Sequence, residues 1–182
     1  MALISEEYRE QNRKLHAKDA NYGSKGYKNA KAAIRLSSEY NGKTVLDYGC
    51  GKRGLEFGLR NTELIVRNYD PATEYNEDPQ PSDIVVCADV LEHIEPECLD
   101  EVLNHITSKI IKVGYFIISC RPALNHLPDG RNTHLMVMEP IWWLHKVKEY
   151  LDVVWSKVNP DEKELILLVE PKEKTNGDHA TH

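Results

Sequence analysis

The chain has 182 residues, of which 41% are hydrophobic and 29% charged, and this composition indicates one globular domain rather than a disordered segment. Its net charge of −6 does not favour binding to a nucleic-acid backbone, which needs a basic surface. No apolar run approaches the roughly 20 residues that cross a bilayer, and the N-terminus lacks the features of a secretory signal. We therefore expect a cytoplasmic protein without a membrane segment, and the oligomeric state stays open.

Two helices are predicted ahead of the main domain. Residues 5–19 are polar and charged, and a turn with two glycines follows them. A second helix is expected from about Tyr27 to Tyr40, where Asn41-Gly42 ends it. We interpret residues 1–40 as an N-terminal helical segment and residues 41–170 as the main domain.

The stretch Thr44–Gly54 is the most informative part of the chain. A short apolar run containing Asp47 opens into three glycines, Gly49, Gly51 and Gly54, with the spacing G-x-G-x-x-G. Glycines allow the backbone to approach a ligand where a Cβ atom would clash, and a helix start presents free N–H groups. The pattern predicts a strand, a ligand-binding turn and a helix; the alternative is a tight structural turn.

Two later strands also lead into acidic residues. The run from Glu63 reaches Asp70, which lies 19 residues after Gly51. An acid at that place suits hydrogen bonds to ribose hydroxyls, and the alternative is a helix cap or turn residue next to Pro71. The run Asp83–Ile94 predicts a buried parallel strand that continues into a polar turn.

The C-terminal half predicts further sheet and helix elements. Apolar residues at helical spacing after Pro96 indicate a helix that packs on the sheet. The elements expected after it are a strand at 113–120, a long loop at 121–138, a helix at 140–150, two strands at 153–158 and 164–170, and a disordered tail at 171–182.

Together these motifs resemble the class I S-adenosylmethionine-dependent methyltransferases over about residues 40–170. Val45–Gly51 resembles the first motif of that family, and Asn68-Tyr69-Asp70 resembles its ribose-binding acid. Asp83–Ile94 resembles the fourth motif, including its Leu91-Glu92-His93 ending. The resemblance implies an α/β, Rossmann-like three-layer sandwich, a mostly parallel sheet with an antiparallel C-terminal strand, and S-adenosylmethionine as the cofactor.

One interval departs from the pattern of that family. Residues 71–82 contain three prolines, so they cannot hold the full helix and third strand that the family normally has there. We therefore expect the third strand to be missing. The acidic residue that often follows it and binds the adenine amino group cannot be assigned.

The resemblance also implies a set of cofactor-binding residues. Asp47 and the glycines lie where the family holds the methionine portion, and Asp89 follows the fourth-motif strand, although it could equally cap the next turn. In relatives an N-terminal segment covers the cofactor, which brings Tyr22 into the set. The predicted cofactor-binding residues are Tyr22, Asp47, Gly49, Cys50, Gly51, Asp70, Ala88 and Asp89.

Histidines and a donor-rich loop are the candidates for chemistry and for acceptor binding. His93 is a candidate general base because imidazole titrates near neutral pH, and the alternative is a structural bond to the backbone. His134 is the second catalytic candidate. Long ordered loops are often functional, so His126, Arg131 and Asn132 are predicted to bind the acceptor, unless the loop is a solvated connection.

One tryptophan and the four cysteines also allow a functional and a structural interpretation. Trp143 is assigned to the wall of an acceptor pocket, with core packing as the alternative. The four cysteines, Cys50, Cys87, Cys98 and Cys120, form no C-x-x-C pair, and they predict reduced thiols rather than disulfides or a zinc site. No metal site is predicted.

The sequence therefore predicts a methyltransferase that acts on a small or exposed oxygen or nitrogen acceptor. The chain has little room for a separate acceptor domain, and it lacks the Asn/Asp-Pro-Pro-Tyr signature of enzymes that methylate DNA amino groups. Two alternatives remain. One is a non-catalytic partner protein that binds S-adenosylmethionine. The other is a nicotinamide-dependent oxidoreductase, which usually lacks an acid at the place of Asp47.

Overall fold

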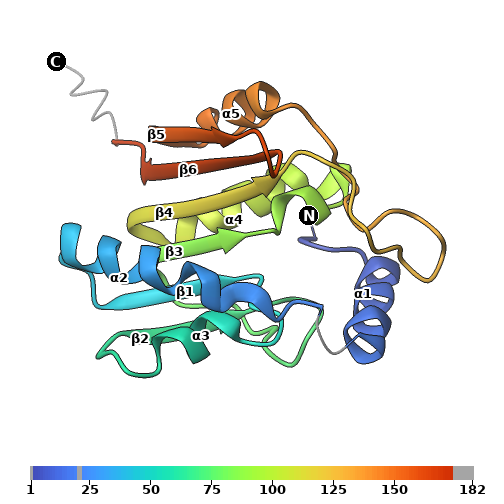
Figure 1. The fold of residues 1–182 in the computed structure, drawn as a ribbon, viewed down its shortest axis with the longest axis horizontal. Helices are drawn as coiled ribbons and strands as arrows, with labels where there is room; N and C mark the ends of the chain where they lie inside the picture. Colours follow the sequence, from blue (N-terminus) through green and yellow to red (C-terminus); the bar gives the residue numbers. More distant parts are fainter. Residues whose placement is uncertain (1, 20–21, 174–182) are drawn as a thin grey trace, which may run out of the picture.

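One six-stranded sheet runs through the described chain, in the order β2-β1-β3-β4-β6-β5 (Figure 1). The computed structural model describes residues 2–19 and 22–173. Strands β1 to β4 are parallel, and β6 lies antiparallel between β4 and β5. The strands are β1 (Thr44–Tyr48), β2 (Ile65–Tyr69), β3 (Ser82–Ala88), β4 (Ile110–Ser119), β5 (Leu151–Asn159) and β6 (Glu164–Pro171).

Helices cover both faces of this sheet and produce three layers (Figure 1). On one face, Leu36 and Leu55 belong to the buried cluster between the helices and the sheet. On the other face, Leu103 and Trp143 pack with Phe116 of β4. The α-helices are α1 (Glu6–Lys18), α2 (Ala30–Glu39), α3 (Gly54–Leu59), α4 (Leu99–Lys109) and α5 (Pro140–Lys148), and the 3-10 helices are η1 (Lys25–Asn29), η2 (Leu91–His93) and η3 (Pro96–Cys98).

This architecture confirms the predicted Rossmann-like sandwich and its antiparallel C-terminal strand. The environment of the central strand β3 explains its continuous apolar run in the sequence. Ile84, Val85, Val86 and Cys87 are all buried, because a parallel strand in the middle of the sheet has helices on both faces.

The predicted absence of a third strand is also confirmed. β2 pairs with β1 and forms one edge of the sheet, and residues 70–81 contain neither a helix nor a strand. Arg67 on β2 donates its Nη1 hydrogens to the Pro81 carbonyl at 3.1 Å and to Ser82 Oγ at 2.9 Å. A side chain of the edge strand thus holds the segment that replaces the missing strand.

The N-terminal segment differs from its prediction in one respect. The helix expected at 5–19 is α1, and Ser5 caps it by accepting a hydrogen bond from the Tyr8 amide at 3.1 Å. The helix expected from Tyr27 instead begins as the 3-10 helix η1 and becomes α-helical only at Ala30. A Cβ atom built on Gly54 would lie 2.7 Å from the Gly26 nitrogen, so η1 packs closely on the start of α3.

The other boundaries agree closely with the predicted ones. β4 begins at Ile110 rather than at 113, because Ile110 already pairs with Ser82 at the start of β3. The predicted disordered tail at 171–182 begins at the last residue of β6, and 174–182 lie outside the described residues. Within the described ranges, no helix has the length and apolar character that a bilayer span requires.

Asp83 provides a test of this fold at the end of the sheet where β1 begins. Its Oδ2 accepts hydrogen bonds from the Lys43 and Thr44 amides at 2.9 and 3.1 Å, which lowers the carboxyl pKa to about 2. Asp83→Ala leaves these amides without their acceptor, so we expect the free energy of unfolding to fall by about 1–3 kcal/mol in urea titrations. Asp152→Ala, on the exposed side of β5, is the control, and an equal effect of both substitutions would contradict this assignment.

Candidate functional site

A cavity of about 610 Å³ lies at the carboxyl ends of the parallel strands. Gly49 follows β1, Asp70 follows β2, and Ala88 ends β3, and all three line the cavity. Ligands in open α/β sheets bind at this edge, and the volume is in the range of small-molecule sites. Residues of α1, η1 and the loop that contains His134 complete the walls.

Asp70 joins the end of β2 to the glycine loop. Its Oδ2 accepts a hydrogen bond from the Gly51 amide at 3.0 Å, and its Oδ1 accepts one from the Ala72 amide at 2.9 Å. The side chain is only 7% exposed, yet it lines the cavity. Because a carboxylate has about four acceptor positions, Asp70 can hold the loop and still accept hydrogen bonds from a ligand. Asp70 thus has the turn-stabilising role that was the alternative, and it also lines the cavity, while its contact with a ligand stays a prediction.

The glycines of the loop allow close packing against other parts of the chain, in addition to the ligand approach that the sequence predicted. Gly49 has φ of 82° and lines the cavity, and a Cβ atom there would clash with Val90. A Cβ atom on Gly51 would lie 2.6 Å from the carbonyl oxygen of Gly23. Gly51 borders a second hollow next to the main cavity. At Gly51 the need for glycine therefore comes from the N-terminal segment rather than from a ligand.

Asp47 and Cys50 lie behind the cavity wall, not in it. Asp47 is 6% exposed, its Oδ2 has no hydrogen-bond partner among the described residues, and burial raises its carboxyl pKa to about 7. Burial likewise raises the pKa of the Cys50 thiol, so this cysteine is a protonated thiol at neutral pH. Neither Asp47 nor Cys50 is among the described residues that line the cavity, so cofactor contacts of these two residues stay a prediction.

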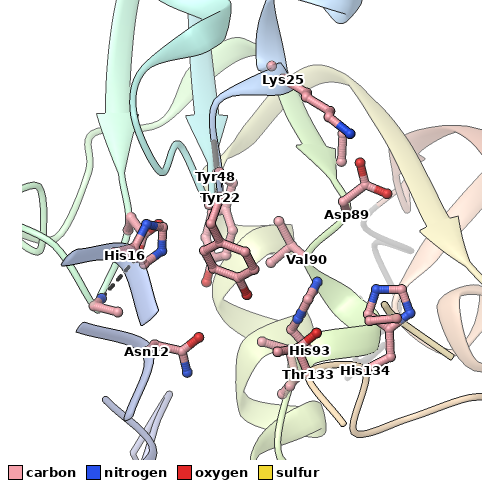
Figure 2. Close-up of a pocket in the computed structure, with 18 of the residues that line it drawn as sticks. Asn12, His16, Tyr22, Lys25, Tyr48, Asp89, Val90, His93, Thr133 and His134 are labelled. Carbon is pink, nitrogen blue, oxygen red and sulfur yellow. Dashed lines mark hydrogen bonds between the residues drawn. The ribbon is translucent and has the colours of Figure 1, made fainter. Parts of the chain in front are cut away.

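One face of α1 supplies cavity residues that the sequence analysis missed. Tyr8, Asn12 and His16 line the cavity together with the predicted Tyr22. Figure 2 shows Asn12, His16 and Tyr22. The rings of His16 and Tyr22 meet edge to face with centroids 4.8 Å apart. The signal was present in the sequence, because residues four apart share one face of a helix. It was overlooked because the segment is polar throughout.

Asp89, His93 and His134 gather at the opposite side of the cavity from His16 and Asn12, with Tyr22 between them (Figure 2). The rings of His93 and His134 meet edge to face at 4.7 Å. His134 Nδ1 lies 2.6 Å from the Arg121 carbonyl oxygen, so this nitrogen carries the hydrogen and Nε2 keeps its lone pair. The structure thus brings together both predicted catalytic histidines.

Glu92 lies directly behind these histidines and was not predicted as a site residue. It is fully buried, and its Oε1 accepts a hydrogen bond from the Ser119 amide at 3.1 Å. Burial raises the pKa of Glu92 well above its ordinary value, and it lowers the pKa of His93 to about 3. Burial thus disfavours the charged forms of both side chains.

The other predicted acceptor residues lie elsewhere. Trp143 is 0% exposed and belongs to the core between α5 and the sheet, because it is on the buried face of that helix. Asn132 holds the loop together by bonding the amide and carbonyl of Ala123, both at 2.9 Å. Arg131 pairs with Asp129 at the surface, and His126 is exposed. None of these four is among the described residues that line the cavity.

Comparison with known proteins supports the fold. The chain matches no protein-family model and no curated protein. Among solved structures it is similar to 1,6-didemethyltoxoflavin-N1-methyltransferase of Burkholderia thailandensis, with bound 1,6-didemethyltoxoflavin and S-adenosylhomocysteine. That match has a TM-score of 0.62 and 17% identity over 92% of this chain and 90% of the other.

Two further solved structures are similar to the chain in fold. Magnesium protoporphyrin IX methyltransferase of Synechocystis, with bound S-adenosylhomocysteine, matches with a TM-score of 0.56 and 13% identity, over 80% of this chain and 83% of the other. The N-methyltransferase NodS of Bradyrhizobium japonicum, in complex with S-adenosylhomocysteine, matches with a TM-score of 0.50 and 15% identity. This match covers 80% of this chain and 87% of the other. The chain therefore has the fold of the class I S-adenosylmethionine-dependent methyltransferases.

The buried carboxyl of Asp47 predicts a specific pH dependence. Because its pKa rises from 3.8 to about 7 on folding, the wild-type protein loses stability relative to Asp47→Asn as the pH increases through that interval. We expect the difference in unfolding free energy to shift by up to about 4 kcal/mol in favour of the variant between pH 4 and pH 8. Urea titrations at several pH values measure it.

Asp83→Asn is the matched control for this experiment. The pKa of Asp83 is lowered from 3.8 to about 2, so its stabilising effect is nearly complete at pH 4 and increases by only about 0.3 kcal/mol up to pH 8. A pH-independent difference for Asp47→Asn as well would show that Asp47 is charged in the folded protein.

Proposed function

We propose that the chain is a methyltransferase that uses S-adenosylmethionine to methylate a small or exposed oxygen or nitrogen acceptor. The observation that carries the proposal is the Asp70 carboxylate, which faces a cavity at the carboxyl edge of a sheet with the class I methyltransferase fold. The solved relatives with S-adenosylhomocysteine bound support the choice of cofactor.

The cavity walls fit the proposed cofactor. Asp70 would accept hydrogen bonds from the ribose hydroxyls, because each of its oxygens is engaged by one amide only. Gly49, Ala88 and Asp89 would flank the methionine portion at the ends of β1 and β3. Tyr22 and the rest of the 1–40 segment would cover the bound molecule, since α1 and η1 already contribute to the walls.

Asp47 and Gly51 take part indirectly in this proposal. Gly51 presents its amide to Asp70 and so holds the carboxylate in place. Asp47 lies one layer deeper, with a free carboxyl oxygen beneath the loop. The predicted cofactor-binding set thus divides into residues that face the cavity and residues that shape the loop around it.

When bound, the cofactor supplies a methyl group activated by its sulfonium sulfur. The contribution of the protein is alignment of the acceptor, and the histidine side of the cavity offers the groups for it. His134 presents an Nε2 lone pair because its Nδ1 hydrogen is committed to Arg121. His93 is held from behind, since its carbonyl accepts a hydrogen bond from the Tyr8 hydroxyl at 2.6 Å.

Tyr8 also limits the size of the acceptor. Its ring is buried in a cluster with Leu15 and Leu127, which joins α1 to the loop that contains His134. Ser5 adds a second connection, because its amide and hydroxyl both bind the Glu95 carboxylate, at 2.8 and 2.6 Å. The N-terminal end of α1 is therefore held next to the histidines at the acceptor side of the cavity, which favours a small molecule or a single exposed group over a folded surface.

The two alternatives have unequal support. A non-catalytic binding protein is favoured by the missing third strand, because the family often binds the adenine amino group after that strand. A nicotinamide oxidoreductase is disfavoured by the antiparallel β6 between β4 and β5, since such domains usually continue with parallel βα units.

Asp70→Ala tests the cofactor proposal. We expect wild-type protein to bind S-adenosylhomocysteine saturably in calorimetry, and we expect Asp70→Ala to weaken this binding at least tenfold because the ribose acceptor is lost. Asp83→Ala is the matched control, because it also removes a carboxylate that holds two backbone amides but lies far from the cavity. Equal affinities for wild type and Asp70→Ala would refute the ribose assignment.

Turnover separates an enzyme from a binding protein. We expect cell extract supplied with S-adenosylmethionine carrying a labelled methyl group to yield a labelled product with wild-type protein and not with Asp70→Ala. Saturable S-adenosylhomocysteine binding without any labelled product would favour the non-catalytic alternative. Stabilisation by nicotinamide dinucleotides alone would favour the oxidoreductase.

A further inference from the structure

We propose that Glu92, His93 and His134 form a binding site for a divalent transition-metal ion at the acceptor side of the cavity. One candidate ligand atom from each residue lies within 4.8 Å of the others. The prediction of no metal site rested on the cysteines, and this cluster contains none. The three residues come from η2 and from the loop after β4, and two of them, His93 and His134, line the cavity.

The spacing of the ligand atoms is close to that of a metal site. His134 Nε2 lies 4.0 Å from Glu92 Oε1. Around one ion with bonds of about 2.0–2.2 Å, ligand atoms lie roughly 3.0–4.2 Å apart. Side-chain shifts of about 1 Å or less would therefore bring all three groups onto one ion.

Two buried polar atoms in the cluster have no partner among the described residues. These atoms are Glu92 Oε2, on a side chain with 0% exposure, and His93 Nδ1. A buried polar group without a partner costs about 1–3 kcal/mol, so such groups are rare and call for an explanation. Both atoms are of the kinds that coordinate metals, and both belong to the three residues that converge.

Neighbouring backbone groups already orient two of the proposed ligands. The Arg121 carbonyl accepts the Nδ1 hydrogen of His134 and leaves Nε2 free to coordinate. Metal-bound histidines commonly donate their other ring hydrogen to a carbonyl or carboxylate in this way. On Glu92, the Ser119 amide binds Oε1 and fixes the carboxylate relative to β4.

The ligand set selects the class of ion. Two imidazoles and one carboxylate suit first-row transition ions such as Mn²⁺, Fe²⁺, Co²⁺ and Zn²⁺, whereas Mg²⁺ and Ca²⁺ prefer oxygen ligands. Three protein ligands leave coordination positions open. Since His93 and His134 line the cavity, those positions face the space proposed for the acceptor (Figure 2).

This location also suggests a role for the ion, which rests on the proposed function. A bound ion would hold an oxygen of the acceptor next to the cofactor and lower the pKa of a coordinated hydroxyl group. The acceptor class that fits best is then a molecule with a hydroxyl, or two neighbouring hydroxyls, near the methylated atom.

Co²⁺ binding tests the metal site independently of any activity. We expect the full-length protein, after treatment with a chelator, to bind one Co²⁺ with visible ligand-field absorption, and we expect Zn²⁺ to displace it. His93→Ala and His134→Ala should each weaken binding at least tenfold. His126→Ala, an exposed histidine of the same loop, is the matched control and should leave Co²⁺ affinity unchanged.

Glu92→Gln is the third ligand variant for the Co²⁺ titrations. Circular dichroism verifies that this variant folds, because Glu92 is buried. Unchanged Co²⁺ affinity in His93→Ala and His134→Ala, or an equal loss in His126→Ala, would overturn the proposal. S-adenosylhomocysteine titrations on the same proteins separate the two claims. If the protein binds S-adenosylhomocysteine but does not bind Co²⁺ at these residues, only the metal proposal is refuted. If it binds Co²⁺ at these residues but does not bind S-adenosylhomocysteine, only the proposed function is refuted.

Discussion

The bridge from Asp70 to the amides of Gly51 and Ala72 is the interaction on which the rest of the site depends. It connects the end of β2 to the turn after β1, and the Tyr69 carbonyl strengthens it by accepting the Gly49 and Cys50 amides at 2.7 and 3.0 Å. Without a third strand, β2 is an edge strand whose end would otherwise lack a neighbour on one side. The same carboxylate that closes the loop also faces the cavity, so the geometry of the loop and the proposed ribose contact cannot be separated.

The N-terminal segment is the second component of the site. It is held by close backbone packing at Gly51 and Gly54 and by polar bonds from Tyr8 and Ser5 to the residues around η2 and η3. These contacts make α1 a wall of the cavity. They also link the two sides of the cavity, since Tyr8 bonds the carbonyl of His93, which is itself a proposed metal ligand.

The fold, and the carboxyl edge of the sheet as the cofactor site, could be predicted from the sequence because short local motifs indicate both. The bounds of β1, the acid after β2 and the absence of a third strand all follow from short stretches with strong turn or strand chemistry. The acceptor side depends instead on the path of the loop at 121–138, which no periodic pattern describes. That is why the sequence did not indicate that His134 lies beside His93, that Trp143 lies in the core, or that the buried Glu92 is more than part of a motif.

We propose that Asp70 binds the ribose of an S-adenosyl cofactor while it continues to hold the glycine loop. A crystal structure of the chain with S-adenosylhomocysteine tests this most directly. We expect the ribose hydroxyls within hydrogen-bond distance of the Asp70 carboxylate, with the amides of Gly51 and Ala72 still bound to it. A ligand that lies elsewhere in the cavity, or a loop that releases Asp70 to admit it, would contradict this role of Asp70.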